Sequence, residues 1–440
     1  MARGPMSPDD QLALLSRGAV EILPDAATLL ERLRLRAREG RPLRVKQGFD
    51  PTAPDIHLGH TVGLRKLRQF QDLGHQVVLI VGDYTGMVGD PSGRNKTRPQ
   101  LTAGEVEDHA RTYLEQFFRV LDPRPAPPRL PVEIHRNGEW FSRMDFMGVM
   151  RLASQYTVAR ILERDDFAKR VREQQPISLH ELFYPIMQGH DSVEIRADVE
   201  LGATEQKFNL LVGRALQEAH GQPPQIALTL PVLPGLDGVQ RMSKSLGNYV
   251  GVTDAPADMF GKLMSLPDRV MADYWTLVTD ADEEKLASIK RQLAVALNPE
   301  EFGIEELQRA GGEAGHPMDI KKDMAHTIVR MYHGEEAAAG AQSDFEAQFS
   351  RRETPEHLEE FGPAELAKAI GHAPAAGIVE VLVASGIAAS KSAARRLVEQ
   401  RAVSVDGVRV SGLDFPVDTG RSFVLRAGRQ MRRFRAGSGS

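Results

Sequence analysis

The sequence contains no cysteine and few aromatic residues. Its 440 residues include 2 Trp and 7 Tyr, and aromatic residues make up 6% of the chain. The absence of cysteine excludes disulfide bonds, thiolate zinc sites and a cysteine nucleophile, so no zinc is expected. A cytoplasmic protein is the expectation, because cysteine-free chains need no oxidising compartment.

Long apolar runs are also missing. The N-terminus lacks the apolar stretch of a signal peptide. Residues 77–81 fall far short of the roughly 20 apolar residues that a membrane span needs, so no membrane partner is expected. The apolar fraction of 41% and the charged fraction of 26% are ordinary for a globular protein. At roughly 100–200 residues per domain, the length predicts two to four domains.

The net charge of −5 conceals an asymmetry along the chain. Residues 373–440 hold 11 basic and 5 acidic residues, so this tail is basic and the rest of the chain is acidic. A basic tail on an acidic body favours nucleic-acid binding. A solvated charged surface is the alternative that charge alone leaves open.

The N-terminal half alternates between the patterns of helices and strands. Leu residues at helical spacing predict a helix over 25–38, and a second helix covers 56–73. Strands are expected at 43–49 and 76–81, and a further strand at 225–230. A strand, a helix and a strand within about 40 residues form a βαβ unit, which indicates an α/β fold with a parallel sheet.

The C-terminal half is mostly helical before it becomes basic. Helical patterns cover residues 253–349, and a Glu- and Pro-rich linker with short helices is expected over 351–375. Two short helices at 378–384 and 390–400 follow. Alternating residues around Asp406 and Gly407 predict a hairpin over 403–410.

His57-Leu58-Gly59-His60 opens the helix that follows the first strand of the βαβ unit. Two imidazoles at i and i+3 share a helix face, and a helix N-terminus offers free N–H groups to phosphate. Gly59 leaves room for close approach of a ligand. The segment is therefore a candidate nucleotide platform, with surface histidines or a metal pair as alternatives.

Arg241-Met242-Ser243-Lys244-Ser245 follows a glycine turn downstream of another strand. A loop with two cations and hydroxyls can close over a triphosphate and stabilise charge that develops in phosphoryl displacement. Taken alone it is a generic polar loop. The ordered pair of segments, each after a predicted strand, is more specific than either.

The two segments resemble the HIGH and KMSKS signatures of class I aminoacyl-tRNA synthetases. Within that class the chain resembles the bacterial tyrosyl-tRNA synthetases, and the order and spacing of matching segments persist over nearly the whole chain. The tail is similar to the S4-like RNA-binding domain of that family. The further segments that carry the resemblance are residues 48–60, 89–94, 184–191 and 205–206.

The resemblance implies an organisation and a reaction. The fold would be a Rossmann-type domain over 1–252 with a helical insertion at about 140–190. A helical anticodon-arm domain (253–350), a linker (351–375) and an S4-like domain (376–436) would follow. The enzyme would join L-tyrosine to tRNA(Tyr), using ATP as substrate with Mg²⁺, and would act as a homodimer.

The resemblance also implies where tyrosine lies. Tyr184, Gln188 and Asp191 fall at i, i+4 and i+7 and share one helix face. Asp191 would accept the phenolic OH, and Asp90 would meet the ammonium. Without the resemblance, a half-buried helix stripe is the plainer interpretation. Further residues expected near tyrosine are Gln206, Asn137 and Thr85.

The ATP and RNA sites follow by the same family positions. Thr52, His57 and His60 would meet the ATP phosphates, and Arg94, Arg98, Lys244 and Ser245 would hold the departing pyrophosphate. Arg241 would be a further catalytic residue. Residues expected to contact the rest of ATP are Gly48, Asp50, Gly59, Ala203, Glu205 and Met242. Residues expected to bind tRNA are Lys391, Arg395, Arg396, Arg432 and Arg433.

The chain departs from the family pattern at four places. Lys46 stands where the family often has a tyrosine that shares the substrate hydroxyl, so Lys46 would either contact Asp191 or point away. Ala203 and Glu205 replace Gly and Asp at the ribose side, and Arg241 replaces a lysine. These changes leave a rival function open, a non-catalytic RNA-binding paralogue. A tryptophan enzyme and a free-standing nucleotidyltransferase are weaker rivals.

Overall fold

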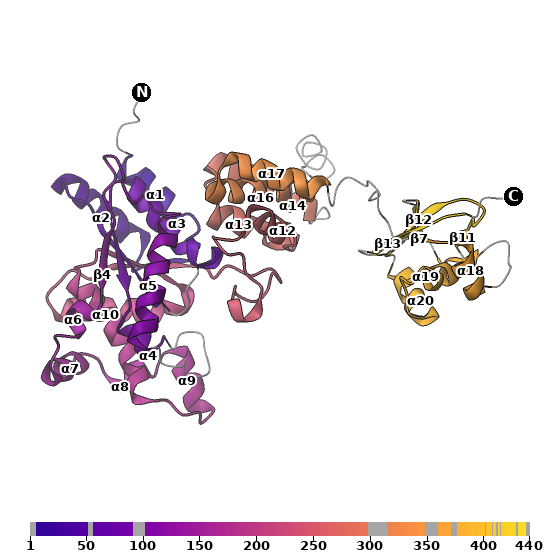
Figure 1. Ribbon diagram of the computed structural model, residues 1–440. Coiled ribbons are helices and arrows are strands. Elements are labelled where there is room, and N and C mark those ends of the chain that lie inside the picture. The colour runs from indigo at the N-terminus through magenta and orange to yellow at the C-terminus, as the bar shows by residue number, and fades with distance from the viewer. Residues whose placement is uncertain are drawn as a thin grey trace. The chain divides into compact units, whose positions relative to one another are not determined.

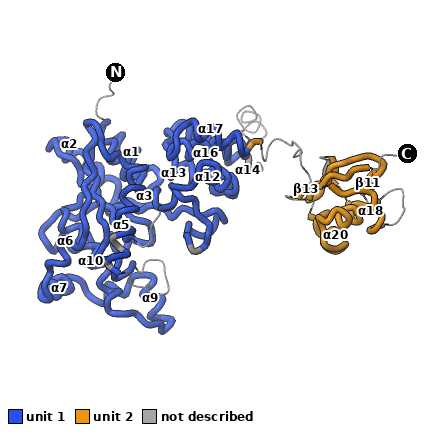
Figure 2. Tube along the Cα trace, viewed as in Figure 1, with its two compact units in different colours: residues 1–345 blue, residues 346–440 orange. Residues whose placement is uncertain are grey.

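The computed structural model describes two compact units, residues 1–345 and 346–440, which are taken one at a time (Figure 2). The residues described are 6–51, 56–90, 102–297, 316–347, 360–370 and 376–436, the last without 401, 407, 411, 414 and 428–429.

A six-stranded sheet forms the centre of the first unit (Figure 1). Neighbouring strands pair in parallel, except that the first strand runs antiparallel to its neighbour at one edge. Helices cover both faces, as the predicted α/β class requires. In spatial order the strands are β1 (Glu21–Leu23), β6 (Ile226–Leu230), β5 (Val199–Ala203), β2 (Arg44–Phe49), β3 (Gln76–Val81) and β4 (Glu133–Arg136).

The predicted βαβ unit is confirmed as β2, α3 (Leu58–Asp72) and β3. Val77 to Val81 are buried, because strands of a parallel sheet are covered on both faces. The helix α3 buries Leu64, Leu67 and Phe70 against the sheet. The helix predicted at 25–38 is also present: Asp25 caps its N-terminus by accepting from the Thr28 N–H at 2.7 Å.

Helices make up most of the remaining first unit. Before and around the sheet lie α1 (Pro8–Ser16), α2 (Ala26–Glu39), α3 (Leu58–Asp72), α4 (Thr85–Val88) and α5 (Ala103–Phe117). Between β4 and β5 lie α6 (Gly138–Phe141), α7 (Phe146–Ala153), α8 (Val158–Ile161), α9 (Asp165–Arg172), η1 (Leu179–Phe183) and α10 (Tyr184–Glu194). After β5 come η2 (Thr204–Gln206), α11 (Lys207–Ala219), η3 (Lys244–Leu246), α12 (Pro256–Met264), η4 (Asp268–Val270), α13 (Met271–Val278), α14 (Glu283–Leu297), α16 (Pro317–His333) and α17 (Glu335–Phe345). No helix among the described residues is long and apolar enough to cross a membrane.

The second unit has its own core, in which Phe423 and Phe434 stack with ring centroids 4.8 Å apart. The predicted hairpin is present as β9 and β10. Its five-stranded sheet has the order β10 (Val408–Arg409), β9 (Val403–Val405), β12 (Phe423–Ala427), β13 (Gln430–Phe434) and β7 (Glu360–Phe361). A pair of short strands and three helices complete it: β8 (Ala376–Gly377), β11 (Pro416–Val417), α18 (Pro363–Ile370), α19 (Ile378–Ala384) and α20 (Lys391–Glu399).

The described part of the predicted linker is not a spacer. The strand β7 pairs with β13, and Phe361 and Leu366 are buried in the core of the second unit. A strand of two residues is too short to show a periodic pattern in the sequence. The prediction for this stretch therefore rested on its composition alone.

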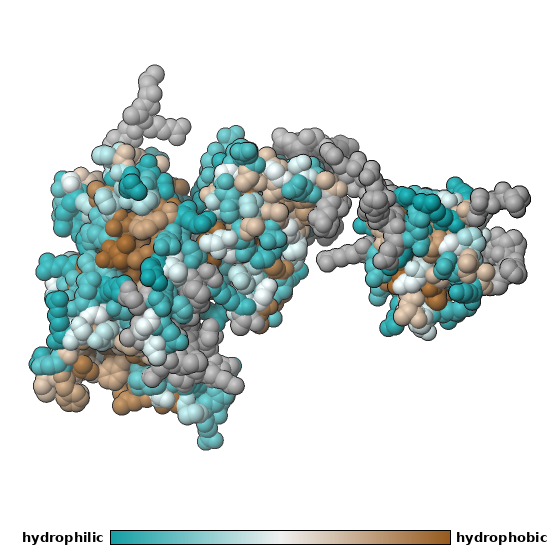
Figure 3. Space-filling model, viewed as in Figure 1, coloured by the Kyte–Doolittle hydropathy of each residue, from teal (hydrophilic) through white to brown (hydrophobic). Residues whose placement is uncertain are grey.

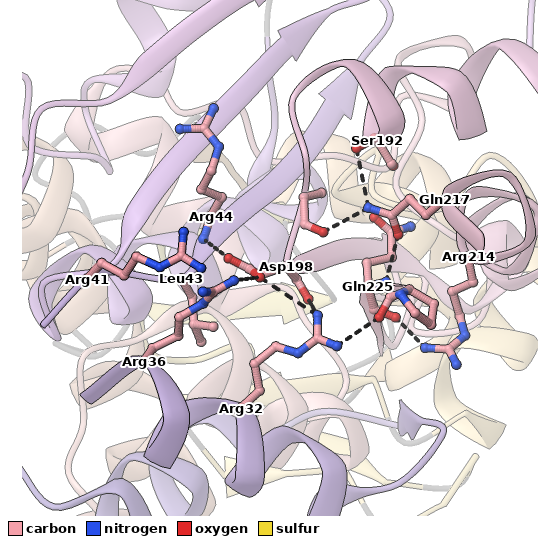
Figure 4. A network of polar contacts seen from close by, with 12 residues as sticks. Arg32, Arg36, Arg41, Leu43, Arg44, Ser192, Asp198, Arg214, Gln217 and Gln225 are labelled. Atoms are coloured by element: carbon pink, nitrogen blue, oxygen red, sulfur yellow. Dashed lines mark hydrogen bonds and ion pairs between the residues drawn. The ribbon is translucent and has the colours of Figure 1, made fainter. Parts of the chain in front are cut away.

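A polar network ties the amino ends of the central strands together (Figure 4). Asp198, which precedes β5, accepts from the Arg36 guanidinium at 2.6 Å and from the Arg44 N–H of β2 at 3.0 Å. Arg32 reaches from the same helix as Arg36 to the backbone oxygens of Asp198 and Pro224. The network therefore anchors α2 to three strands at the edge of the sheet opposite to their carboxyl ends.

We expect Asp198→Ala to lower the free energy of unfolding by about 2–4 kcal/mol, because it removes the carboxylate that pairs with the guanidinium groups of Arg36 and Arg32, the latter at 3.8 Å, and that accepts from the Arg44 N–H. Urea unfolding followed by circular dichroism measures this. The matched control is Asp9→Ala, which removes the exposed Asp9–Arg34 pair of 2.9 Å and should cost less than about 1 kcal/mol. Equal losses in the two variants would contradict the anchoring role.

Candidate active site

A cavity of about 630 Å³ opens at the carboxyl ends of β2, β5 and β6. This is where the connections of a doubly wound sheet diverge, and ligands of such folds bind there. The cavity brings together both signature segments and most of the predicted residues. The predicted residues that line it are Gly48, Asp50, His57, Gly59, His60, Asp90, Tyr184, Ala203, Glu205, Gln206, Arg241, Met242 and Lys244.

His57 and His60 stack at the start of α3, with ring centroids 3.9 Å apart. Burial and the nearby Lys244 lower the pKa of His57 to about 2 and that of His60 to about 4, so both rings are neutral at pH 7. The His57 N–H donates to Nδ1 of His60 at 3.2 Å, so the neutral His60 ring carries its proton on Nε2. Each ring can therefore act as a neutral hydrogen-bond donor.

The absence of a side chain at Gly59 matters for packing within the protein as well as for the approach of a ligand. A Cβ at this position would lie 3.0 Å from the His57 ring and 3.6 Å from Cβ of Met242. The second signature segment is thus packed against the first. The Leu58 N–H donates to the Val250 carbonyl at 2.9 Å, which fixes the chain after the loop to the start of α3.

The loop that carries Arg241 to Lys244 is held by its own hydrogen bonds. Asn248 Nδ2 donates to Asp237 at 3.1 Å and to the Arg241 carbonyl at 3.1 Å, and its Oδ1 accepts from the Ser243 N–H at 2.8 Å. Arg241 also forms an ion pair of 2.8 Å with Glu205, which follows β5. Two of the departures from the family pattern therefore contact one another.

Asp50 organises the end of β2. Its carboxylate accepts from the Thr85 hydroxyl at 2.8 Å and from the Tyr184 phenol at 2.8 Å. Gly82 was not anticipated from the sequence: a Cβ there would lie 2.2 Å from Asp50 and 2.3 Å from Thr85. A chain of hydrogen bonds continues from Thr85 to Asn137 at 3.0 Å.

The predicted helix face exists, but only Tyr184 of its three residues lines the cavity. Gln188 and Asp191 are buried, as are Thr85 and Asn137. Asp191 accepts from Nε1 of Trp140 at 3.0 Å and from Asn137 at 3.4 Å. Burial raises the pKa of Asp191 to about 7, against the opposing effect of Lys46.

Asp90 lines the cavity and lies 3.6 Å from the guanidinium of Arg164. Arg164 is buried and also binds Asp166 at 2.7 Å and Asn209 at 3.1 Å. Nothing in the sequence distinguished this arginine from the other cations of the insertion. Gln206 also lines the cavity and accepts from the Ala203 N–H at 3.0 Å.

Lys46 does not line the cavity, and its ammonium pairs with Glu200 on the neighbouring strand, with 2.9 Å between Nζ and Oε1. Glu200 was not anticipated. Of the other predicted residues, Thr52, Arg94, Arg98 and the side chain of Ser245 lie outside what the structure describes.

The predicted RNA-binding residues lie on two elements of the second unit. Lys391, Arg395 and Arg396 are exposed on α20, where Lys391 pairs with Glu380 at 3.1 Å. Arg432 and Arg433 are half-buried on β13.

Comparisons with known families cover most of the chain. Residues 38–350 match the family of tRNA synthetases class I (W and Y). Residues 365–430 match the tyrosine–tRNA ligase SYY-like C-terminal domain. The first match covers the cavity and both signature segments.

Individual relatives agree with these matches. A tyrosine–tRNA ligase from Moorella thermoacetica is 48% identical over 420 residues, which cover 96% of this chain and 94% of the relative. One from Thermotoga maritima is 46% identical over 426 residues, 97% of each chain. A solved tyrosyl-tRNA synthetase from Archaeoglobus fulgidus, complexed with L-tyrosine, has a TM-score of 0.56 and 22% identity over 77% of this chain and 100% of that one, a likeness of fold. The resemblance and the fold class predicted from the sequence are confirmed, and the chain belongs to the tyrosine–tRNA ligase family of class I aminoacyl-tRNA synthetases.

Proposed function

We propose that this chain catalyses both steps of the tyrosine–tRNA ligase reaction. ATP and L-tyrosine form tyrosyl-adenylate and pyrophosphate, and the tyrosyl group then passes to the 3′ end of tRNA(Tyr) with release of AMP. The observation that carries this proposal is one cavity lined by both signature segments together with Asp90 and Tyr184. Near-full-length similarity to tyrosine–tRNA ligases supports it.

The first step needs no nucleophile from the protein. The tyrosine carboxylate attacks the α-phosphate in line, and the protein positions the reactants and stabilises developing charge. The neutral rings of His57 and His60 would donate hydrogen bonds to phosphate oxygens, and Lys244 and Arg241 would neutralise the departing pyrophosphate. The family resemblance alone supports phosphate contacts for Thr52, Arg94, Arg98 and Ser245.

Tyrosine would enter between Asp90 and Tyr184, with its phenol directed toward Asp191. Asp191 is buried and does not line the cavity, so this proposal includes a rearrangement of neighbouring side chains when tyrosine binds. A site built to hydrogen-bond a hydroxyl rejects the analogue that lacks it, since its buried polar group is left unpaired. Tyrosyl-tRNA synthetases are a known example of such discrimination.

The ribose side supports the catalytic proposal over the RNA-binding paralogue. That rival rested on Ala203 and Glu205. Glu205 pairs with Arg241, so the longer carboxylate has a partner that matches it. Gln206 and Met242 also line this part of the cavity.

Mg²⁺ would arrive with ATP. Among the residues that the structure describes, no group of three or more His, Asp or Glu side chains could hold a metal ion. The described residues are therefore compatible with an Mg²⁺ ion that is held by phosphate oxygens and water, as is usual for Mg²⁺ with nucleotides. Such an ion would neutralise charge on the phosphates beside Lys244. A reaction that charges tRNA for translation implies a cytoplasmic location.

The test of this proposal is ATP–pyrophosphate exchange without tRNA, with tyrosine, phenylalanine and tryptophan in turn. We expect exchange with tyrosine only. Asp191→Ala should lower kcat/KM for tyrosine about 10–100-fold, the worth of a hydrogen bond to a charged group. No exchange with any amino acid, from a folded protein that binds tRNA, would support the RNA-binding paralogue instead.

We further propose that the second unit binds tRNA through the exposed cations of α20. Such contacts supply affinity for phosphate and for RNA shape. Their strength depends on salt, because binding releases counterions. The half-buried Arg432 and Arg433 of β13 would contribute to the same function.

The double variant Arg395→Ala, Arg396→Ala should lower kcat/KM for tRNA charging about tenfold and reduce its salt dependence. Tyrosine-dependent ATP–pyrophosphate exchange should not change. Arg421→Ala, an exposed arginine near Asp418 in the same unit, is the matched control. Unaltered charging by the double variant would exclude α20 as the RNA contact.

The active protein would be a homodimer. Apolar side chains are exposed over the helical insertion, where Figure 3 shows apolar surface over α7 and α8. Phe146 is 76% exposed and Leu179 is 72% exposed. Exposed apolar surface of this kind marks contact sites between proteins.

Sedimentation equilibrium should give twice the chain mass of 48.5 kDa. The double variant Phe146→Asp, Leu179→Asp should shift the protein toward a monomer, because it places charge in the contact. Val20→Asp changes an exposed apolar residue outside the insertion and should remain dimeric. A monomeric wild-type protein at micromolar concentration would refute the dimer.

A further inference from the structure

Lys46 and Glu200 form a fully buried ion pair behind the cavity. Both side chains have 0% exposure, and 2.9 Å separates Nζ from Oε1. The two residues stand opposite one another in the register of β2 and β5, so their side chains leave the sheet on the same face. Neither residue lines the cavity. A buried charge is costly, so this pair needs a reason beyond filling space.

All three protons of the Lys46 ammonium are used within the protein. Besides Glu200, the ammonium donates to the Gln188 carbonyl at 2.8 Å and to the Ser192 hydroxyl at 2.8 Å. Gln188 and Ser192 lie one turn apart on α10 and flank Asp191. Direct contact between Lys46 and a substrate would therefore have to break one of these bonds.

Glu200 is saturated in the same way. Its Oε1 accepts from Nε2 of Gln188 at 3.0 Å, and its Oε2 accepts from Ser192 at 3.1 Å and from the Gln225 amide. Asn209 of α11 donates to Oε1 of Gln188 at 2.8 Å. Both ends of the Gln188 amide are thus held, and one of the two holders is Glu200.

Two glycines allow α10 and α11 to pack closely around this network. A Cβ at Gly189 would lie 3.1 Å from the backbone N of Gly213. A Cβ at Gly213 would lie 2.6 Å from the Gln225 amide and 3.3 Å from Glu200. The pair therefore lies where the central strands meet both helices.

We propose that the Lys46–Glu200 pair positions the face of α10 that binds tyrosine, and so sets the affinity for tyrosine without touching it. The pair fixes the orientation of the Gln188 amide and the distance of α10 from the sheet on either side of Asp191. Both are positioning residues. The inference depends on the proposed function, because it assigns a role in binding tyrosine.

The test compares KM for tyrosine with KM for ATP in ATP–pyrophosphate exchange by the full-length protein. Lys46→Met and Glu200→Gln should each raise KM for tyrosine at least about tenfold, with KM for ATP within about twofold. In the double variant, the rise in KM for tyrosine should be smaller than the product of the two single rises, because this variant leaves no unpaired buried charge. Its KM for tyrosine should still be raised, about fivefold.

A milder variant tests the inference even if Lys46→Met or Glu200→Gln does not fold. Ser192→Ala keeps both charges and deletes the hydroxyl that binds them, so it should raise KM for tyrosine about threefold. Ser385→Ala removes a buried serine hydroxyl of the second unit and is the matched control, expected to leave both KM values unchanged.

Two results would overturn the inference. Wild-type KM for tyrosine in Ser192→Ala and in the double variant would reduce the pair to a purely structural role. A rise in KM for tyrosine confined to Lys46→Met, with Glu200→Gln unaffected, would indicate that Lys46 contacts the substrate directly. Failure of the wild-type protein to exchange with tyrosine would instead refute the proposed function.

Discussion

The parallel pairing of β2 with β5 determines where the whole site forms. The chain leaves β2 toward α3 and β3 on one side, while β5 continues into η2 and α11 on the other. The edge of the sheet is therefore open between their carboxyl ends. Asp50 at the end of β2 and Ala203 at the end of β5 line the same cavity for this reason. The helix α3 also begins here, and His57, Gly59 and His60 at its start line the cavity.

Charge in the site follows from that geometry. Lys244 lies near the histidine rings, and together with burial it keeps both rings neutral. Neutral rings can donate hydrogen bonds to phosphate without adding repulsion to the cations already present. In the proposed reaction, the positive charge would therefore lie on the loop that carries Arg241 and Lys244, while the buried rings of His57 and His60 would supply directional contacts.

The sequence predicted the helices and strands whose residues follow a periodic pattern. The strands β2 and β3, the helix α3 and the stripe of α10 follow from periodicity, and the structure confirms them. Features that depend on a single long-range contact could not be predicted. Arg164 beside Asp90 is one example, since an arginine in a basic insertion carries no local signal. The short antiparallel strand β1 is another, because three residues are too few to show alternation.

Three of the four departures from the family pattern, Lys46, Glu205 and Arg241, are members of ion pairs. Arg241 and Glu205 are 36 residues apart in the chain, yet each supplies the partner that the other needs. The same holds for Lys46 and Glu200.

An anion within reach stabilises a lysine in a buried strand, because an unpaired ammonium would cost several kcal/mol there. One source of that anion is a neighbouring strand at the same register. Glu200 stands between Val199 and Leu201 in another buried strand, so it was the one acidic residue of β5 that could meet Lys46. The pair was therefore detectable in principle, but only once the strand order was known.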